Sequence, residues 1–248
     1  MNIAYAKPLR NSTEILGLPV DNVGMPEAMD AIKRMLGEDA SHIVITADSS
    51  GLVIAQNDPE YRQIIREADL VTPDSYGVVW AVKRKGGTVR ERVAGVELVD
   101  KLSRLSADKG YRIFLLGSAP GVAELAAERL KLLHPGCNIV GTRHGYFPAD
   151  SDTVVAQEIA LTKPDILFVA MGIPRQEKFI KQTQGIIKAK VAIGVGGSLD
   201  VYSGKTKRAP VLIQKLRVEW LWRLLLNPKK WAKAKTLPKF ALMVLRSR

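Results

Sequence analysis

The sequence predicts an α/β protein with a Rossmann-like, doubly wound and mainly parallel sheet, helices on both faces, and a basic helical C-terminal appendage. Three observations predict this fold. Short apolar runs alternate with longer stretches of helical periodicity, the pattern of parallel strands joined by right-handed crossovers. Several runs are continuously apolar, as expected for strands buried on both faces. The composition changes at about Ser203, where helix-forming and basic residues replace the glycine-rich strand pattern.

Six strands are expected, and each one ends in a polar or glycine-rich turn. They span residues 42–46, 70–72, 112–116, 138–142, 166–171 and 191–195. Helices are expected at residues 26–36, 51–67, 76–84, 96–109, 122–133, 153–161 and 175–187. Pro26 and Pro120 suit first helical turns, and Asp152 fits the N-cap of its helix. Because such sheets bind ligands at the carboxyl ends of their strands, the six turns predict one ligand crevice.

The two ends of the chain differ in charge. The 248 residues carry a net charge of +12, and all of it falls in residues 203–248, where 13 Lys or Arg accompany one acid, Glu219. We therefore divide the chain into an α/β domain, 1–202, which is expected to carry the chemistry, and a basic, tryptophan-rich appendage, 203–248. Tryptophan favours the lipid headgroup layer and Lys/Arg are attracted to anionic lipid, which predicts membrane docking. Basic residues with stacking aromatic rings equally fit single-stranded nucleic acid.

The totals exclude several classes of protein. Hydrophobic residues make up 46% of the chain and charged residues 25%, which is typical of a globular protein. The single cysteine, Cys137, excludes an internal disulfide framework and a cysteine zinc cluster. The N-terminus lacks the apolar stretch of a signal peptide, and no run approaches the ~18 apolar residues of a membrane span. Any membrane contact is therefore expected to be peripheral and cytoplasmic, at the inner face of the cell membrane.

The aspartate after the second strand is the leading catalytic candidate. Asp74 follows an apolar strand and a proline, so we expect it to point from the sheet edge into the crevice. A carboxylate in that place can accept a proton from a hydroxyl nucleophile. The alternative, which the residues alone favour, is that Asp74 caps the helix that begins near Ser75. Thr46, at the end of the first strand, could bind substrate, whereas strand threonines usually pack.

Glycine-rich turns and one arginine are candidates for binding phosphate. Residues 117–121 and 194–197 could bring backbone amides to a diphosphate, but neither matches GxGxxG or a P-loop, which disfavours NAD and P-loop chemistry. Arg92 could clamp a phosphate, and a solvated surface arginine is the alternative. Asp150 and Asp152 form a DxD pattern, but they precede a helix, so capping is favoured. No His or Cys spacing resembles a metal site, and we expect neither metal nor cofactor.

Taken in order, the strand-end segments resemble the WecG/TagA/CpsF glycosyltransferase family. The matching segments are TAD at 46–48, PDSYGVVWA at 73–81, ERVAG at 91–95, FLLGSAPGVAE at 114–124, GTRHGYF at 141–147, GIPRQEKF at 172–179, GVGGSLDVYSGKTKRAP at 194–210 and VEWLWRLLLNP at 218–228. The resemblance runs from about Ile15 to Pro228. It is closest to the TagA branch, which acts in synthesis of the wall teichoic acid linkage unit.

The resemblance implies an inverting glycosyltransferase that needs no metal. Such an enzyme moves N-acetylmannosamine from UDP-ManNAc to the C4 hydroxyl of GlcNAc-diphospho-undecaprenol and forms a β-1,4 link. The alternative within the family is a UDP-ManNAcA donor, which carries the uronic acid. The alternative from another class is a basic nucleic-acid-binding module. The basic appendage could bind either anionic lipid or nucleic acid, and a lipid-linked acceptor favours lipid. The implied partner is therefore an anionic membrane surface and not nucleic acid. A homo-oligomer is a further option.

The resemblance also implies roles for individual residues. Asp74 becomes the base and Thr46 orients the substrate. The residues implied to contact the sugar nucleotide are Asp48, Arg92, Tyr146, Gln176, Gly196, Gly197 and Ser198. Two positions depart from the family pattern, because Asp48 replaces an asparagine and Ser75 replaces a glycine. The appendage residues expected to contact membrane or phosphate are Arg217, Trp220, Arg223, Lys229, Lys230 and Trp231.

Overall fold

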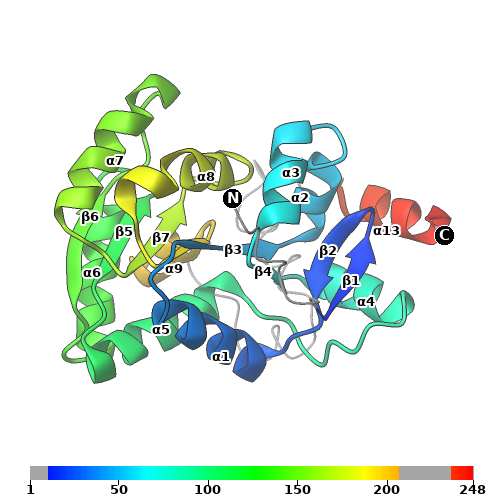
Figure 1. The fold of residues 1–248 in the computed structure, drawn as a ribbon, viewed down its shortest axis with the longest axis horizontal. Coiled ribbons are helices and arrows are strands. Elements are labelled where there is room, and N and C mark those ends of the chain that lie inside the picture. Colours follow the sequence, from blue (N-terminus) through cyan, green and yellow to red (C-terminus); the bar gives the residue numbers. More distant parts are fainter. Residues whose placement is uncertain (1–10, 207–235, 248) are drawn as a thin grey trace, which may run out of the picture.

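The computed structural model describes residues 11–206 and 236–247, and its centre is a six-stranded parallel sheet (Figure 1). In chain order the strands are β3 (His42–Ala47), β4 (Leu70–Pro73), β5 (Ile113–Gly117), β6 (Ile139–Arg143), β7 (Ile166–Ala170) and β8 (Val191–Gly194). In space their order is β4-β3-β8-β7-β5-β6, and every neighbouring pair is parallel. The six expected strands and the α/β fold are confirmed.

Helices cover both faces of this sheet. They are α1 (Met25–Leu36), α2 (Ser49–Ile54), α3 (Pro59–Glu67), α4 (Tyr76–Arg84), α5 (Gly95–Lys109), α6 (Val122–Leu133), α7 (Asp152–Leu161), α8 (Arg175–Ile187) and α9 (Ser198–Tyr202), with a 3-10 turn, η1 (Ala149–Ser151). In Figure 1, α2, α3 and α8 lie along one side of the sheet, while α1 and α5 lie along the other. Side chains of β3 alternate between the two cores, because Ile43 and Ile45 face one cluster and Val44 faces the other.

A hairpin that the sequence analysis did not predict precedes α1. Its strands β1 (Ser12–Ile15) and β2 (Leu18–Asp21) are joined by Leu16 and Gly17, which both have positive φ, 55° and 75°. This is the backbone of a two-residue hairpin turn whose twist matches that of the strands. The Asp21 carboxylate accepts the N–H of Val71 at 2.7 Å, which fixes the hairpin beside the edge strand β4.

One helix and the role of one proline differ from the prediction. The single helix expected at 51–67 is in fact two helices, α2 and α3. Asp58 caps α3 by accepting a backbone N–H, and Pro59 occupies its first turn, so the chain starts a new helix there. The placement of Pro120 in the first turn of α6 is also wrong. That helix begins at Val122, and Gly121 with φ of 80° is its N-cap.

The last described helix, α13 (Thr236–Arg246), belongs to the body of the protein (Figure 1). Its Phe240 and Val244 are each 1% exposed and lie in the same apolar cluster as residues of α2 and α4. Thr236 Oγ1 also lies 2.9 Å from Ser50 Oγ on α2. Residues 207–235, the greater part of the appendage, lie outside the described residues, so the division of the chain at residue 202 stays a prediction. No helix in the two described ranges is long and apolar enough to cross a membrane.

Candidate active site

The carboxyl ends of the six strands lie along one edge of the sheet, where the crevice is expected. The spatial order of the strands, and not their order in the chain, decides which turns are neighbours. Strands β4, β3, β8 and β7 are consecutive, so the segments that follow them lie together. These segments carry Asp74, Asp48, residues 194–198 and Gln176. We call Asp74, Asp48, residues 194–198 and Gln176 the near half of the crevice. The far half consists of the ends of β5 and β6 together with the ion pairs that α7 makes with Arg143 and Arg175.

Asp74 leaves the end of β4 half-buried and anchored by its backbone. Its N–H donates to the carbonyl of Ala47 on β3 at 2.9 Å. The cap of α4 is the next residue, Ser75, whose Oγ accepts the N–H of Val78 at 3.3 Å. The capping alternative for Asp74 is therefore wrong. Asp74 lies one residue before that cap, at the edge where a base would be needed.

The departure at residue 75 has a structural consequence. Ser75 Oγ lies 3.1 Å from Ser49 Oγ and accepts the Ser49 N–H at 3.3 Å, which ties the start of α2 to the start of α4. A Cβ on Gly77 would lie 2.5 Å from Ser49 Oγ, so the two helix starts are in close contact. Sequence reasoning missed this pair, although both serines follow strand ends. Ser75 thus supplies a cap and a bridge that a glycine cannot.

The end of β3 contributes Thr46 and Asp48. Thr46 is 5% exposed, and its hydroxyl donates to the carbonyl of Gly194 on β8 at 2.8 Å. Asp48 is the N-cap of α2, because its Oδ1 accepts the N–H of Gly51 at 2.6 Å. Both side chains therefore stabilise the strand end itself. An asparagine oxygen could make the same cap, so this hydrogen bond does not require the aspartate.

A buried tyrosine lies beneath this end of the sheet. Tyr61 is 1% exposed, and a Cβ on Gly51 would lie 2.9 Å from its hydroxyl oxygen. Burial, with the carboxylates of Glu177 and Asp48 nearby, raises the pKa of Tyr61 well above its ordinary value. The phenol therefore remains protonated at physiological pH and keeps its hydrogen to donate.

Arg92 reaches the same end of the crevice through its own loop. The N–H of Val93 donates to the carbonyl of Pro73 at 2.8 Å, so the loop runs beside the end of β4. The Arg92 guanidinium carbon lies 5.2 Å from the ring centroid of Tyr76, within range of a cation–π contact. Its Nη2 lies 3.9 Å from Glu97 Oε1. The structure thus brings a guanidinium group to the strand end that carries Asp74.

The turn after β8 is held by hydrogen bonds from two directions. Gly196 has a φ of 53°, in the region that favours glycine, and its N–H donates to Gln176 Oε1 at 3.1 Å. Ser198 Oγ donates to the carbonyl of Val195 at 2.6 Å, where Gly197 leads into α9. Gln176 is 1% exposed. The structure therefore places Gln176 behind the glycine turn, in contact with its backbone.

Tyr146 lies in the far half of the crevice. It follows β6, but its loop folds back over the neighbouring strand ends, because a Cβ on Gly145 would lie 2.9 Å from Gly117 Cα at the end of β5 and 2.9 Å from Met171 Cγ after β7. The Tyr146 side chain is 71% exposed, and its backbone N–H donates to His144 Nδ1 at 3.2 Å. The loop that carries Tyr146 therefore lies over the ends of β5 and β7.

The far half is closed by an ion pair that corrects two expectations. Asp152 does not cap α7; Ser151 stands at the N-cap position and makes no side-chain capping bond. The Asp152 carboxylate is 8% exposed and accepts both terminal nitrogens of Arg175, with Nη1 at 2.6 Å from Oδ2. The Arg175 guanidinium also lies 5.6 Å from the ring of Phe147 and 5.8 Å from that of Phe179. Asp152, the second aspartate of the DxD pattern, therefore forms an ion pair with Arg175.

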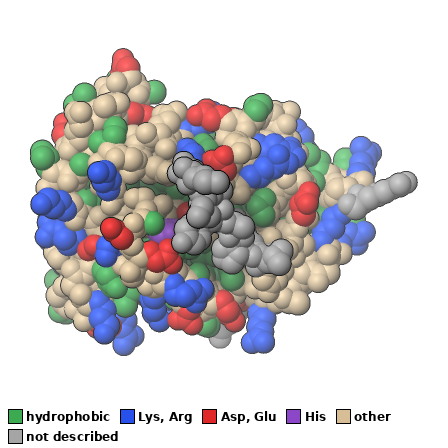
Figure 2. All heavy atoms as spheres, viewed as in Figure 1, with side chains coloured by type: hydrophobic (Ala, Val, Ile, Leu, Met, Phe, Trp, Pro, Cys, Tyr) green, Lys and Arg blue, Asp and Glu red, His purple; other side chains and the backbone are tan. Residues whose placement is uncertain are grey.

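The structure tests neither the metal nor the appendage predictions. Within residues 11–206 and 236–247, no group of three or more His, Cys, Asp or Glu side chains could hold a metal ion. The six appendage residues expected to contact membrane or phosphate lie outside those ranges. They are Arg217, Trp220, Arg223, Lys229, Lys230 and Trp231. On the face drawn in Figure 2, basic and acidic side chains are interspersed and not gathered by sign, in keeping with the neutral body.

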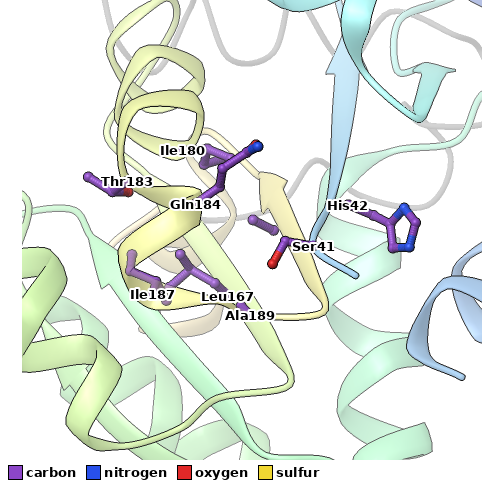
Figure 3. Close-up of a pocket in the computed structure, with 9 residues that line it drawn as sticks. Ser41, His42, Leu167, Ile180, Thr183, Gln184, Ile187 and Ala189 are labelled. Atoms are coloured by element: carbon purple, nitrogen blue, oxygen red, sulfur yellow. The ribbon is translucent and has the colours of Figure 1, made fainter. Parts of the chain in front are cut away.

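A small apolar pocket lies at the other end of the strands (Figure 3). It is lined by residues near the start of β3 and β8 and on α8, among them His42, Ile180, Thr183 and Ala189. It is barely large enough for one water molecule. The pocket cannot hold a sugar nucleotide and is separate from the crevice.

Comparison with known proteins gives a consistent result. The model of the glycosyl transferase WecG/TagA/CpsF family matches residues 13–248. The chain is 36% identical to a protein of Bacillus spizizenii over 85% of this chain and 81% of that protein. It is 32% identical to a Staphylococcus aureus protein over 95% and 92%, and 33% identical to one of Bacillus subtilis over 94% and 90%. All three are named N-acetylglucosaminyldiphosphoundecaprenol N-acetyl-beta-D-mannosaminyltransferase.

Proposed function

Because the chain belongs to the WecG/TagA/CpsF family of glycosyl transferases, we propose that it transfers N-acetylmannosamine from UDP-ManNAc to the C4 hydroxyl of GlcNAc-diphospho-undecaprenol. The names of three relatives that align with most of this chain support this acceptor and this sugar. The observation that carries the proposal in the structure is the position of Asp74, a half-buried carboxylate at a strand end with Arg92 on the adjoining loop.

In this reaction Asp74 is the base. Its carboxylate takes the proton of the acceptor C4 hydroxyl while that oxygen forms a bond to the anomeric carbon of the donor. The bond between the anomeric carbon and the diphosphate oxygen breaks, and its electron pair leaves with UDP. Attack from the face opposite the leaving group inverts the configuration and gives the β-1,4 link. Thr46, which is fixed to β8 by its hydroxyl, orients the substrate at the end of β3.

Negative charge develops on the departing UDP and needs positive groups around it. Arg92 and the backbone N–H groups of the glycine turn supply them, and no metal ion is required for this step. Transfer is therefore expected to persist in EDTA. We assign further substrate contacts to Asp48, Tyr146, Gln176, Gly196, Gly197 and Ser198. Arg217 and Arg223 of the appendage add two guanidinium groups if the appendage covers the crevice.

The lipid-linked acceptor also implies where the enzyme works. We propose that residues 203–248 hold the enzyme at the inner face of the cell membrane, with Trp220 and Trp231 in the headgroup layer and Lys229 and Lys230 on anionic lipid. Co-sedimentation with vesicles checks this. Binding is expected to vesicles that contain phosphatidylglycerol and not to purely zwitterionic ones, and equal binding to both would contradict the electrostatic contribution. The homo-oligomer stays a prediction.

The test is a transfer assay with purified full-length protein, UDP-ManNAc and a lipid-diphosphate GlcNAc acceptor. Asp74→Asn is expected to lower kcat by about 10³-fold, the middle of the range for loss of a general base. Asp30→Asn is the matched control, since Asp30 is an exposed carboxylate on α1. Undiminished transfer by Asp74→Asn overturns the base. If the wild type transfers no sugar, the proposed function is wrong. If it uses UDP-ManNAcA in preference to UDP-ManNAc, the donor is the uronic acid.

A further inference from the structure

A buried carboxylate that the proposed reaction does not use lies behind the glycine turn. Glu177 is fully buried at the start of α8, directly after Gln176. Gln176 Nε2 donates to Glu177 Oε1 at 2.7 Å, and Gln176 Oε1 accepts the N–H of Gly196 at 3.1 Å. A chain of two hydrogen bonds therefore runs from the Glu177 carboxylate, through one amide, to the backbone of the turn after β8.

The backbone of β8 packs directly against this pair. A Cβ on Gly194 would lie 2.6 Å from Gln176 Nε2 and 3.0 Å from Glu177 Oε1, so only glycine allows the approach. The carbonyl of the same Gly194 accepts the hydroxyl of Thr46 on β3. The network thus joins the ends of β3 and β8 to the start of α8, across the near half of the crevice.

A backbone donor and a carboxyl acceptor together fix which way the amide points. A glutamine side chain can present either its oxygen or its NH₂ group, whereas a backbone N–H can only donate. The Gly196 N–H therefore requires the Gln176 oxygen on its own side, which leaves the NH₂ group for Glu177 Oε1 to accept. With the oxygen turned the other way, the Gly196 N–H would face an NH₂ group and lose its partner, which is costly for a buried donor.

We infer that Glu177 is a positioning residue for the transfer reaction, acting through the Gln176 amide to hold the Gly196 N–H and the backbone of the glycine turn at the crevice edge. The inference rests on the proposed function, because that turn is assigned to the departing diphosphate. Donors act on developing charge only when they are fixed before the reaction, so a loosened turn lowers kcat more than it raises KM.

Glu177→Gln is the main test, since it keeps the shape of the side chain and removes only its fixed role as acceptor. Hydrogen exchange measured by mass spectrometry on peptides that contain Gly196 is expected to become about tenfold faster, the value of one charged hydrogen bond. The kcat for UDP-ManNAc is expected to fall about tenfold. Gly194→Ala crowds the same hydrogen-bonded pair from the β8 side, because its Cβ would lie 2.6 Å from Gln176 Nε2 and 3.0 Å from Glu177 Oε1, and it should give both effects if Glu177→Gln does not fold.

Thr183→Val is the matched control on the same helix. Thr183 is 2% exposed and its hydroxyl donates to the carbonyl of Phe179, remote from the crevice, so its loss lowers stability only. The positioning role is wrong if hydrogen exchange at Gly196 is no faster in Glu177→Gln and Gly194→Ala than in Thr183→Val. It is also wrong if exchange becomes faster in these two variants while kcat stays the same. A wild type without transfer overturns the proposed function alone, because the exchange measurement still decides whether Glu177 holds the turn.

Discussion

The two halves of the crevice use polar side chains in different ways. In the near half, Asp48, Ser75 and Gln176 hold backbone N–H groups and so fix the ends of β3, β4 and β8 around Asp74. In the far half, charged side chains pair with one another, Arg175 with Asp152 and Arg143 with Glu158. Side chains of the near half therefore position the backbone, whereas side chains of the far half neutralise one another's charge.

This difference separates two kinds of contribution to the reaction. A preorganised backbone with a carboxylate and a guanidinium suits a transition state, where charge moves over short distances. Ion pairs that are already satisfied add rigidity and leave little charge for chemistry. We therefore expect substitutions in the near half to change kcat, and substitutions in the far half to change stability or substrate affinity.

The largest effect expected from this comparison is that of Arg92→Ala. Removal of the guanidinium beside the end of β4 is expected to lower kcat by about 10²-fold, as for the loss of one group that stabilises developing charge. Arg90→Ala is the control, because Arg90 is exposed two residues away. Steady-state kinetics with UDP-ManNAc measures both. Equal kinetic constants for the two variants would show that Arg92 takes no part in the reaction.

Asp152→Asn tests the far half through stability. It leaves the Arg175 guanidinium without its carboxylate, and we expect the free energy of unfolding to fall by about 2 kcal/mol. The loss is smaller than for a fully buried pair because the Arg175 side chain is 30% exposed. Urea unfolding measures it, with the exposed Asp150→Asn as control. A tenfold loss of kcat in folded Asp152→Asn would show that the far half takes part in the chemistry.

The strands could be predicted because parallel strands buried on both faces are continuously apolar. Several of the six have that property, and all six were located as short apolar runs between helical stretches. The hairpin at Ser12–Ile15 and Leu18–Asp21 was missed, since its short strands mix polar with apolar residues. The break between α2 and α3 was missed although Asp58 and Pro59 signal a helix start.

The candidate site was only partly predictable, for a topological reason. The residues at the strand ends are readable from the sequence, but the neighbour order β4-β3-β8-β7-β5-β6 is not. That order puts Asp74 beside Asp48 and places β6, the strand before Tyr146, at the opposite edge of the sheet. Choosing the cap of α4 was equally out of reach, since Asp74 and Ser75 are adjacent and both residue types cap helices well.

Ser75 allows a smaller test within the near half. Ser75→Ala removes the cap of α4 and the bridge to Ser49, so we expect a loss of about 1 kcal/mol in the free energy of unfolding. Ser75→Gly, which restores the family's glycine, is expected to cost only a few tenths of a kcal/mol, because glycine is tolerated at the N-cap. Urea unfolding of both variants measures the difference. An equal loss in both would assign the stabilisation to the serine bridge and not to the cap.

The smallest effect is expected at Tyr146. Its side chain is 71% exposed on a loop over the ends of β5 and β7, apart from β4, so we expect it to touch only a part of the donor that does not react. Such a contact is the same in the ground state and the transition state, and its loss raises KM without changing kcat. Tyr146→Ala is therefore expected to raise KM for UDP-ManNAc about threefold, the value of one weak contact, and to leave stability unchanged. Leu161→Ala, an exposed residue at the end of α7 that lies away from the crevice, should change neither constant. If Tyr146→Ala instead lowers kcat as Arg92→Ala does, the far half reaches the reacting atoms, and the two halves must close on each other during transfer.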